Sequence, residues 1–497
     1  MTKKASKGYN SFMISSTQEV VVLNKFKATK LIFSIIFIFS LIFSVFTLID
    51  THQNDNKNSF EAKTENSSAV NLHINKIDTT NFPKIKLSIS IDDGFGKYIV
   101  DSNIKNYIIH ENPKDKSKTN TITKISPLKN DSPLSIAFAV DKSQNMTSND
   151  FFNAKDLISN FLKYGNIKDY SNISIISFSN DISLEKDSAE KNNTLDSYFS
   201  NQEFNGGSAL YDSFYSSLLE TASDKQTKIV VGIIKSEDSK SLKTIDDVVE
   251  KSLELNIPIY ILNLSEKENL YCKEIAKSTG GLYFSPKNLE QSENIIKSII
   301  EREKKQITIE FISNKSKTLN NDNNSLSINF SNTNYYGSAN RTYTINQVVN
   351  PNSQIPDEVL SNMTDLERAI YNYEYSFVKA VNSKDFSFLK SSLYENGPLW
   401  NDQLKLIENY KKRGIKEKLL HYKILNWNKT SDEKIEVTIK EQIRISYPDT
   451  KSYYREYENT YTLVNSETGY KIYSLDNINV IDELPFISKK EAGVLLP

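Results

Sequence analysis

The middle of the chain alternates short apolar runs with longer stretches that are apolar on one face only. The apolar runs predict buried strands at residues 134–140, 173–178, 228–234, 257–263 and 282–284. The stretches between them have a helical period and predict helices at about 149–163, 208–222, 243–255, 268–278 and 288–303. Strands that alternate with helices form a doubly wound parallel sheet. We therefore predict an α/β domain over residues 131–305.

The segments on both sides of this domain alternate apolar and polar residues. Residues 85–91 carry Ile or Leu at every second position, which predicts a strand with one buried face. Further strands are predicted at 98–100 and 107–110 before the domain, and at 306–312, 326–330 and 341–346 after it. The arrangement is similar to a small immunoglobulin-like module. Because neither side holds enough strands for a full sandwich, we predict one β-sandwich module, built from 83–130 and 306–347, with the α/β domain inserted into it.

After a linker at 348–362, residues 363–482 predict two helices followed by four strands. Thr364 and Glu367 have the spacing of a capping box at the start of the first helix. The second helix is predicted at about 398–412, and the strands at about 416–428, 433–447, 451–464 and 469–475, with a tail at 483–497. This order, with the helix phrase FVKAVNSKDFSFL, resembles the α+β cone of the nuclear transport factor two-like family, found in some Gram-positive surface proteins.

The resemblance to this cone implies an internal pocket, and Glu441 has the right phase to face it. Arg455 occupies an inward position on the next strand. We expect the two side chains to form a structural ion pair, because no histidine or second catalytic partner has a matching phase. The alternative is a hydrolase or isomerase in which Glu441 is the base.

The N-terminal segment predicts a membrane anchor. Residues 31–49 contain no charge, and a helix of this length spans about 28 Å, close to the thickness of the hydrocarbon core. Lysines dominate residues 1–30, which predicts a cytoplasmic tail there and an extracytoplasmic location for the rest of the chain. A cleaved signal peptide is the alternative to this single-pass helix. Residues 50–82 are polar and predict a flexible stalk.

Composition excludes several classes of function. The chain has 61 Lys and Arg against 62 Asp and Glu, so it offers no strongly basic surface to nucleic acid. Its one cysteine, Cys272, excludes an internal disulfide and a site with several thiolate ligands. The 4 histidines are scattered without ligand spacing.

Three short motifs in the α/β domain point to a known family. Asp141, Ser143 and Asn145 follow the first strand at alternate positions, where open α/β sheets place their ligand sites. Residues 206–212 read GGSALYD, and residues 228–238 form a strand that ends in KSED. These stretches resemble the D-x-S-x-S, GGTALYD and T-D-G-E-D motifs of the von Willebrand factor type A (VWA) family. The resemblance covers residues 131–305.

The VWA resemblance implies a site for Mg²⁺ or Mn²⁺ above the sheet. Carried over by position, its oxygen ligands are Asp141, Ser143, Asn145 and Ser208. Lys235 replaces the expected aspartate, and an ammonium about 4 Å from a dication costs on the order of 8 kcal/mol at an effective dielectric near 20. We therefore expect a degenerate site, in which the ammonium of Lys235 occupies or abuts the cation position and pairs with Asp141.

Two alternatives remain for this degenerate site. In one, Glu237 or Asp238 replaces the missing ligand, and the site binds Mg²⁺ or Mn²⁺ weakly. In the other, Asp141, Ser143 and Ser208 hydrogen-bond to loop backbones, and Ser208 caps the following helix.

The leading hypothesis is a bacterial, membrane-anchored surface protein without enzymatic activity. It would bind an extracellular or cell-envelope protein through the loops at 141–147, 204–209 and 235–240, as an adhesion or interaction protein with no required cofactor. The alternative is a cell-envelope ligand-binding or sensor protein that acts through the C-terminal pocket.

Overall fold

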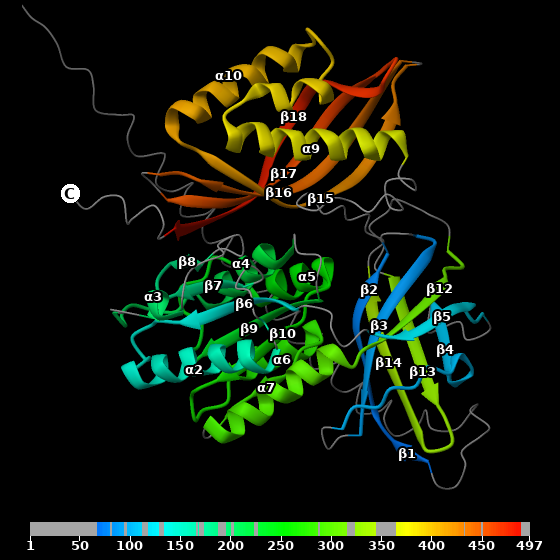
Figure 1. Ribbon diagram of the computed structural model, residues 1–497, viewed down its shortest axis with the longest axis vertical. Helices are drawn as coiled ribbons and strands as arrows, with labels where there is room; N and C mark the ends of the chain where they lie inside the picture. Colours follow the sequence, from blue (N-terminus) through cyan, green and yellow to red (C-terminus); the bar gives the residue numbers. More distant parts are fainter. Residues whose placement is uncertain are drawn as a thin grey trace, which may run out of the picture. The chain divides into compact units, whose positions relative to one another are not determined.

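The computed structural model describes most of the chain from residue 67 onward (Figure 1). The described ranges are 67–79, 82–93, 97–111, 118–128, 134–165, 167, 173–186, 195–199, 203–222, 227–286, 289–315, 324–343, 364–431, 433–448 and 451–488. The predicted cytoplasmic tail, transmembrane helix and linker at 348–362 lie outside these ranges. Within them, no helix is long and apolar enough to cross a membrane.

The central domain is built on six strands in the order β11-β10-β9-β6-β7-β8. Their bounds are β6 Leu134–Asp141, β7 Ile173–Phe178, β8 Ile182–Lys186, β9 Thr227–Ile234, β10 Ile259–Asn263 and β11 Tyr283–Phe284. All neighbours pair in parallel except β7 and β8. This confirms the predicted α/β domain with a parallel sheet. The sequence pattern missed β8, because this short edge strand carries the buried charged residues Glu185 and Lys186.

Helices cover both faces of this sheet. They are α2 Ser148–Gly165, α3 Leu195–Phe199, α4 Leu210–Ala222, α5 Ile245–Leu255, α6 Leu270–Thr279 and α7 Leu289–Lys304. Helices α2 and α7 share one hydrophobic cluster with the sheet, whereas α4, α5 and α6 belong to the cluster on the other face (Figure 1). Each of the longer helices lies within about two residues of its predicted position.

Two four-stranded sheets flank the central domain. One has the order β1-β14-β13-β4 and the other β2-β3-β12-β5. The bounds are β1 Ser68–Ala69, β2 Asn71–Asp78, β3 Lys84–Asp92, β4 Tyr107–Glu111, β5 Ile122–Pro127, β12 Ile307–Ile312, β13 Asn324–Ser331 and β14 Tyr335–Tyr343, with the short 3-10 helix η1 Ile104–Asn106. Strand β12 pairs with β3 and β5, and β13 pairs with β4. Strands from before and after the central domain therefore share sheets, as the insertion hypothesis requires.

Two predictions for these flanking segments are wrong. Strand β2 lies inside the predicted stalk at 50–82, where a register shift between Ile74 and Lys76 breaks the two-residue alternation. At 98–100 the structure has only an isolated bridge from Tyr98 to Asp92 instead of a strand.

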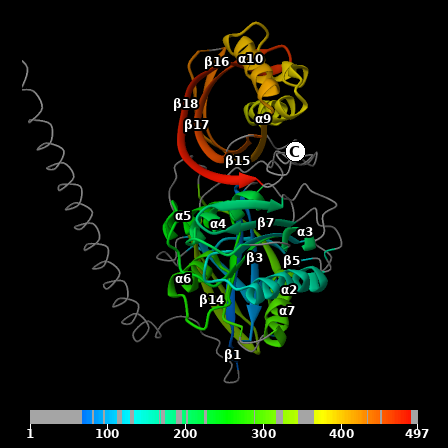
Figure 2. The same ribbon diagram turned by 90° about the vertical axis from the view of Figure 1, so that its left-hand side faces the viewer.

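The C-terminal domain has two helices and a four-stranded antiparallel sheet. Its elements are α9 Asp365–Ser383, α10 Pro398–Arg413, β15 Lys416–Lys429, β16 Lys434–Ser446, β17 Ser452–Ser466 and β18 Gly469–Ser488, with the 3-10 helices η3 Phe386–Phe388 and η4 Lys390–Ser392. The strands curl around α9 and α10 (Figure 2). The capping box of Thr364 and Glu367 is present. Strand β18 extends into the predicted tail at 483–497, beyond the predicted end at 475, because it leaves the domain to pair with β8.

The central and C-terminal domains share one sheet and one hydrophobic cluster. Ile487 and Ser488 of β18 pair in parallel with β8, which makes a continuous ten-stranded sheet. Leu484 and Phe486 belong to the same buried cluster as Phe214 of α4. The C-terminal domain thus covers α4 and the β8 edge of the central domain.

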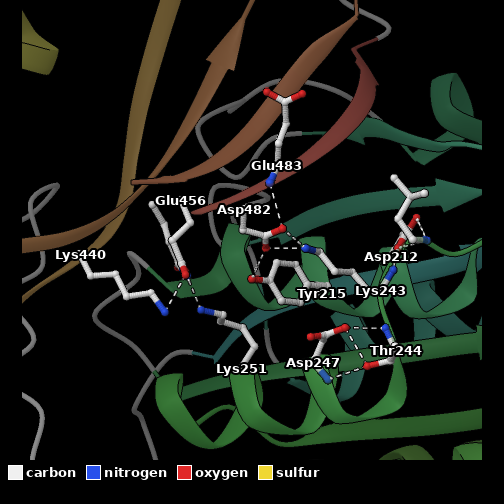
Figure 3. Close-up of polar contacts among 12 residues, drawn as sticks. Asp212, Tyr215, Lys243, Thr244, Asp247, Lys251, Lys440, Glu456, Asp482 and Glu483 are labelled. Carbon is white, nitrogen blue, oxygen red and sulfur yellow. Dashed lines mark hydrogen bonds and ion pairs between the residues drawn. The ribbon is translucent and has the colours of Figure 1, made fainter. Parts of the chain in front are cut away.

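Ion pairs surround this shared cluster (Figure 3). Lys251 of α5 contacts Glu456 of β17 at 2.9 Å, and Lys440 contacts the other oxygen of that carboxylate at 2.6 Å. Asp482 of β18 accepts from the hydroxyl of Tyr215 at 3.1 Å and pairs with Lys243. Apolar and polar contacts thus both join the two domains.

Candidate functional site

Asp141 ends β6 at the carboxyl edge of the central sheet and is completely buried. Its Oδ1 accepts a hydrogen bond from the backbone N–H of Ser143 at 2.8 Å. Its Oδ2 accepts from the backbone N–H groups of Lys235 and Ser236, at 3.0 and 2.9 Å. The carboxylate therefore ties the loop after β6 to the loop after β9, and both of its oxygens are engaged.

Ser236 is the residue that faces the side chains of the first loop. Its Oγ lies 2.6 Å from Oγ of Ser143, and Nδ2 of Asn145 donates to it at 3.2 Å. The structure thus brings Asp141, Ser143 and Asn145 together as predicted, but Ser236, rather than Lys235, lies opposite them. The sequence offered a signal for this residue, because Ser236 is also polar and immediately follows the strand end.

The predicted pair of Lys235 and Asp141 is wrong. Only the backbone of Lys235 contacts Asp141, while its Nζ lies 2.5 Å from Oδ2 of Asp150 in the first turn of α2. Burial opposes the ionisation of Asp150, but the hydrogen bonds from Lys235 and Thr147 outweigh it and lower the pKa of this carboxyl. The ammonium of Lys235 therefore lies beside Asp150 and does not occupy the cation position that the VWA resemblance implies.

Ser208 lies beside this network but does not cap α4. Its Oγ is buried and finds no hydrogen-bond partner in the described part of the chain, while its N–H donates to Oγ of Ser239 at 3.0 Å. Asp238 supplies the cap instead, because its Oδ1 accepts from the N–H of Leu210 at 2.9 Å. The suggestion that Ser208 caps this helix is therefore wrong.

The oxygen atoms of this network are not arranged to bind a divalent cation. Asp141 is the one carboxylate in the network, and three N–H groups occupy its oxygens. The hydroxyls of Ser143 and Ser236 lie in direct contact, whereas Mg²⁺ and Mn²⁺ need several oxygens around a common centre. Glu237 pairs with Lys267 at 2.7 Å, and Asp238 accepts from the N–H of Leu210. Neither carboxylate therefore takes part in this network. Within the described ranges, no group of three or more His, Cys, Asp or Glu residues could hold a metal ion.

A polar cavity of about 510 Å³ opens over these loops. Its described lining residues all belong to the central domain: Gln144, Asn145, Lys235, Ser236, Glu237, Asp238, Ser239, Asn263, Ser265, Lys267 and Asn269. They come from the segments after β6, β9 and β10. The C-terminal domain therefore does not line this cavity.

Exposed apolar side chains occur at the same edge of the sheet. Phe152 lies in the first turn of α2, Leu242 precedes α5, and Leu270 and Tyr271 begin α6. Their exposed fractions are 65%, 68%, 68% and 61%. Each follows a strand that ends at this edge, and we call these four residues together with the polar cavity the loop face. Exposed apolar residues gathered around polar groups are typical of protein contact surfaces.

The interior of the C-terminal domain holds buried carboxyl groups. Glu441 faces inward as predicted and accepts from Nδ2 of Asn459, but Arg455 pairs with Glu483 at 2.6 Å, so the predicted Glu441–Arg455 pair is wrong. Burial raises the pKa of both Glu441 and Glu374. Burial and the nearby charge of Glu441 raise the pKa of Glu417 to about 8. With this pKa, Glu417 is mainly protonated at neutral pH.

Two family models match the chain. Residues 135–298 match the von Willebrand factor type A domain, and residues 362–476 match the NTF2-like domain of the TcaA protein. The chain therefore contains a VWA domain and an NTF2-like domain, as its sequence predicted, and the family match adds that the second is of the TcaA type.

Several solved structures are similar to the chain, at low sequence identity. A von Willebrand factor type A protein from Catenulispora acidiphila is 8% identical, with 70% of this chain and 91% of that protein covered and a TM-score of 0.31. The intermembrane space region of the chloroplast protein ARC6 is 12% identical, with coverages of 26% and 99% and a TM-score of 0.21. Proximal thread matrix protein 1 from the mussel byssus is 10% identical, with coverages of 38% and 50% and a TM-score of 0.31. No curated protein matches the chain.

Proposed function

We propose that this protein, a VWA domain joined to an NTF2-like domain, is a non-enzymatic binding protein that contacts another protein through its loop face. The observation that carries the proposal is that Phe152, Leu242, Leu270 and Tyr271 are exposed on segments that follow the same sheet edge as a polar cavity. Large apolar side chains that stay exposed cost solvation free energy, and a partner surface that covers them recovers it. The partner is an extracellular or cell-envelope protein with a complementary apolar patch.

The position of the C-terminal domain supports this choice of surface. That domain covers α4 and the β8 edge, and the described lining of the loop-face cavity comes from the central domain alone. The loop face is thus the part of the central domain that carries both exposed apolar groups and unburied polar groups.

We further propose that binding needs no resident divalent cation. Hydrogen bonds from Ser143, Lys235 and Ser236 hold Asp141, and they fix the relative positions of the two loops in the way a shared ion would. The four predicted ligands, Asp141, Ser143, Asn145 and Ser208, then act as a scaffold for the loop face.

The apolar run at 31–49 supports a single-pass anchor, with the described domains on the extracytoplasmic side of a bacterial cell membrane. The assignments of the flanking sheets to an immunoglobulin-like module and of the C-terminal sheet to a cone with a pocket belong to the same proposal.

The second candidate function is a sensor that binds a cell-envelope ligand through the C-terminal domain. Ile478 and Val480 of β18 favour it, because they are 60% and 49% exposed and Ile478 pairs with Asn459, which donates to the buried Glu441.

Charge substitutions on the loop face test the leading proposal. The full chain is titrated onto cell envelopes of its own host that lack it, and its affinity is compared with those of Leu242→Asp and Tyr271→Asp. We expect each variant to weaken binding at least tenfold, which corresponds to the loss of a buried apolar contact worth about 1.4 kcal/mol or more. Val100→Asp is the matched control, because Val100 is also exposed but lies near the flanking sheets.

The same titration separates the two candidate functions. Ile478→Asp should bind as well as the parent chain if the loop face is the contact surface. Loss of binding in Ile478→Asp, with Leu242→Asp and Tyr271→Asp unchanged, would overturn the proposal and favour the sensor.

A further inference from the structure

Two arginines, the buried Arg302 and the half-buried Arg341, lie where the central domain meets the flanking sheets. Arg302 lies in the last turn of α7 and is 1% exposed, and Arg341 lies on β14. Neither guanidinium forms an ion pair with a carboxylate among the described residues. Buried arginines are normally paired, because an uncompensated charge is costly in a low-dielectric interior.

The present partners of both arginines are neutral. Arg302 donates from Nε to Oγ of Ser90 at 3.3 Å, and from Nη2 to Oδ1 of Asn75 at 3.2 Å and to the carbonyl of Gly280 at 2.9 Å. Arg341 donates from Nη1 to the carbonyls of Ile74 and Asn75, at 2.8 and 2.7 Å. Both guanidinium groups thus converge on Asn75 of β2.

Among the described residues, three buried donors in this cluster have no acceptor: Nη1 of Arg302, Nη2 of Arg341 and Nδ2 of Asn75. The orientation of the Asn75 amide is fixed, because its Oδ1 already accepts from Arg302 and from the hydroxyl of Ser90 at 3.2 Å. Asn75 is 2% exposed, so bulk water does not satisfy its Nδ2. Each unsatisfied buried donor lowers the stability of the fold, and the cost is larger when the donor is charged.

The neighbouring acids do not supply the missing acceptor. Asp92 contacts His73 at 3.1 Å, and Glu303 accepts from the hydroxyl of Tyr260 at 2.5 Å and also from Gln306. Burial raises the pKa of Glu303, which favours its neutral form. The carbonyl end of α7 offsets part of the Arg302 charge but contributes no acceptor to its Nη1.

The positive charge of Arg302 lowers the pKa of neighbouring basic groups. Burial and then the charge of Arg302 lower the pKa of Arg341 to about 10, so Arg341 remains protonated at neutral pH. The same two causes, in the same order, lower the pKa of His73. The cluster therefore carries two positive charges and three nitrogen donors that have no acceptor among the described residues.

We propose that Arg302, Arg341 and Asn75 bind a small tetrahedral oxyanion of the phosphate or sulfate class. A dianion of this kind neutralises both guanidinium groups and offers several acceptor oxygens to N–H groups that come from different elements. A cavity of about 450 Å³ borders the cluster at Asn75, although neither arginine lines it. Its charged lining residues are Lys76, Lys86, Lys228, Asp78 and Glu303, so the lysines outnumber the acids on this approach, which favours an anion.

The bound anion would connect three parts of the fold. Asn75 belongs to β2, before the central domain, Arg302 to the helix that ends that domain, and Arg341 to β14 after it. The ion therefore fastens the end of the inserted domain to sheet strands from both sides of the insertion.

Thermal unfolding of the full chain tests this site. Inorganic phosphate is titrated against sodium chloride of matched ionic strength, because chloride screens charge without offering tetrahedral oxygens. We expect phosphate to raise the midpoint by several degrees in a saturable way, and Arg341→Gln to lose this response. Arg413→Gln, an exposed arginine of the C-terminal domain, is the control and should keep it.

A second variant keeps the test decisive if Arg341→Gln fails to fold. Asn75→Asp replaces the unpartnered Nδ2 with a fixed carboxylate oxygen between the two arginines. We expect it to raise the unfolding midpoint in phosphate-free buffer and to abolish the response to phosphate. Equal effects of phosphate and chloride on the parent chain, or a full phosphate response in Asn75→Asp, would overturn the proposal.

Discussion

Glu220 shows at the scale of one side chain how the VWA and NTF2-like domains are joined. This α4 residue is fully buried, and its carboxylate receives Arg444 at 2.8 and 2.9 Å, Lys418 at 3.2 Å and the hydroxyl of Tyr454 at 2.9 Å. All three partners belong to the C-terminal domain. One carboxylate therefore compensates two cations that the domain contact removes from water.

Glu220→Gln should destabilise the protein by about 3–5 kcal/mol, because it keeps the shape of the side chain but removes the buried negative charge that Arg444 and Lys418 contact. Chemical denaturation of the full chain measures this change. Glu237→Gln is the control, since it breaks only an exposed pair with Lys267 and should have little effect. Equal stability of Glu220→Gln and the parent would show that this contact does not hold the domains together.

Glu417 makes stability depend on pH. Its pKa is about 8 in the folded chain, because burial favours the protonated acid, against a reference value of 4.5. The stability linked to this group is fully present below pH 4.5 and is lost as the pH rises toward 8, since the unfolded chain then gains from ionising it. Glu417→Gln should therefore gain on the order of a few kcal/mol relative to the parent at pH 8.5, and almost nothing at pH 4.5.

The measurement for Glu417 is denaturant unfolding of both chains across this pH range. Glu467→Gln, a substitution in an exposed turn, serves as the control and should follow the parent curve. A constant difference between Glu417→Gln and the parent at all pH values would contradict the assigned protonation.

Single residues are where sequence reasoning was least complete. The D-x-S-x-N pattern correctly brought Asp141, Ser143 and Asn145 to one place, because these positions follow directly from the end of a parallel strand. It failed to choose between Lys235 and Ser236, since a shift of one residue reverses which side chain faces the loop. The partner of Lys235, Asp150, belongs to another element, and a local sequence pattern does not predict a contact between elements that lie far apart in the chain.

At the scale of elements, β18 is the strand that connects the two folds. It begins in the antiparallel sheet of the C-terminal domain and ends beside β8 of the central sheet. Phe486, near its end, is 1% exposed and lies 4.6 Å from the ring of Tyr454 between centroids. The end of this strand therefore contributes to the core of both domains.

Phe486→Ala should cost about 3–5 kcal/mol, because it opens a cavity in the shared cluster. We expect calorimetric unfolding to change from one transition to two as the domains uncouple. Ile487→Ala is a matched control, since the neighbouring Ile487 is 42% exposed and contributes mainly its backbone to the pairing. A single transition in Phe486→Ala with unchanged midpoint would contradict this role.

Elements with a clear period were predicted well, and those that break the period were not. The helices of the central domain and strands β15 to β17 follow their hydrophobic patterns closely. In contrast, β2 contains a bulge, β8 carries buried charges, and residues 476–481 of β18 are exposed on both faces. Their structure depends on pairing with distant strands, which local periodicity does not report.

At the scale of the whole molecule, the described domains form one connected structure. The central domain is inserted between strands that share sheets, and its far side is joined to the C-terminal domain. The sequence predicted the insertion from incomplete strand counts on each side. It did not predict the ten-stranded sheet, because the pairing of β8 with β18 connects residues about three hundred positions apart.

This arrangement leaves the loop face as the contact surface that we assign to the partner, with hydrogen bonds in place of a cation. Calorimetric titration of Mg²⁺ and Mn²⁺ into the full chain, beside its Ser236→Asp variant, tests this claim most directly. We predict no binding heat from the parent, and binding in Ser236→Asp, where a second carboxylate faces Ser143 and Asn145. Saturable binding by the parent that Asp141→Asn abolishes would contradict the claim and establish a working metal site.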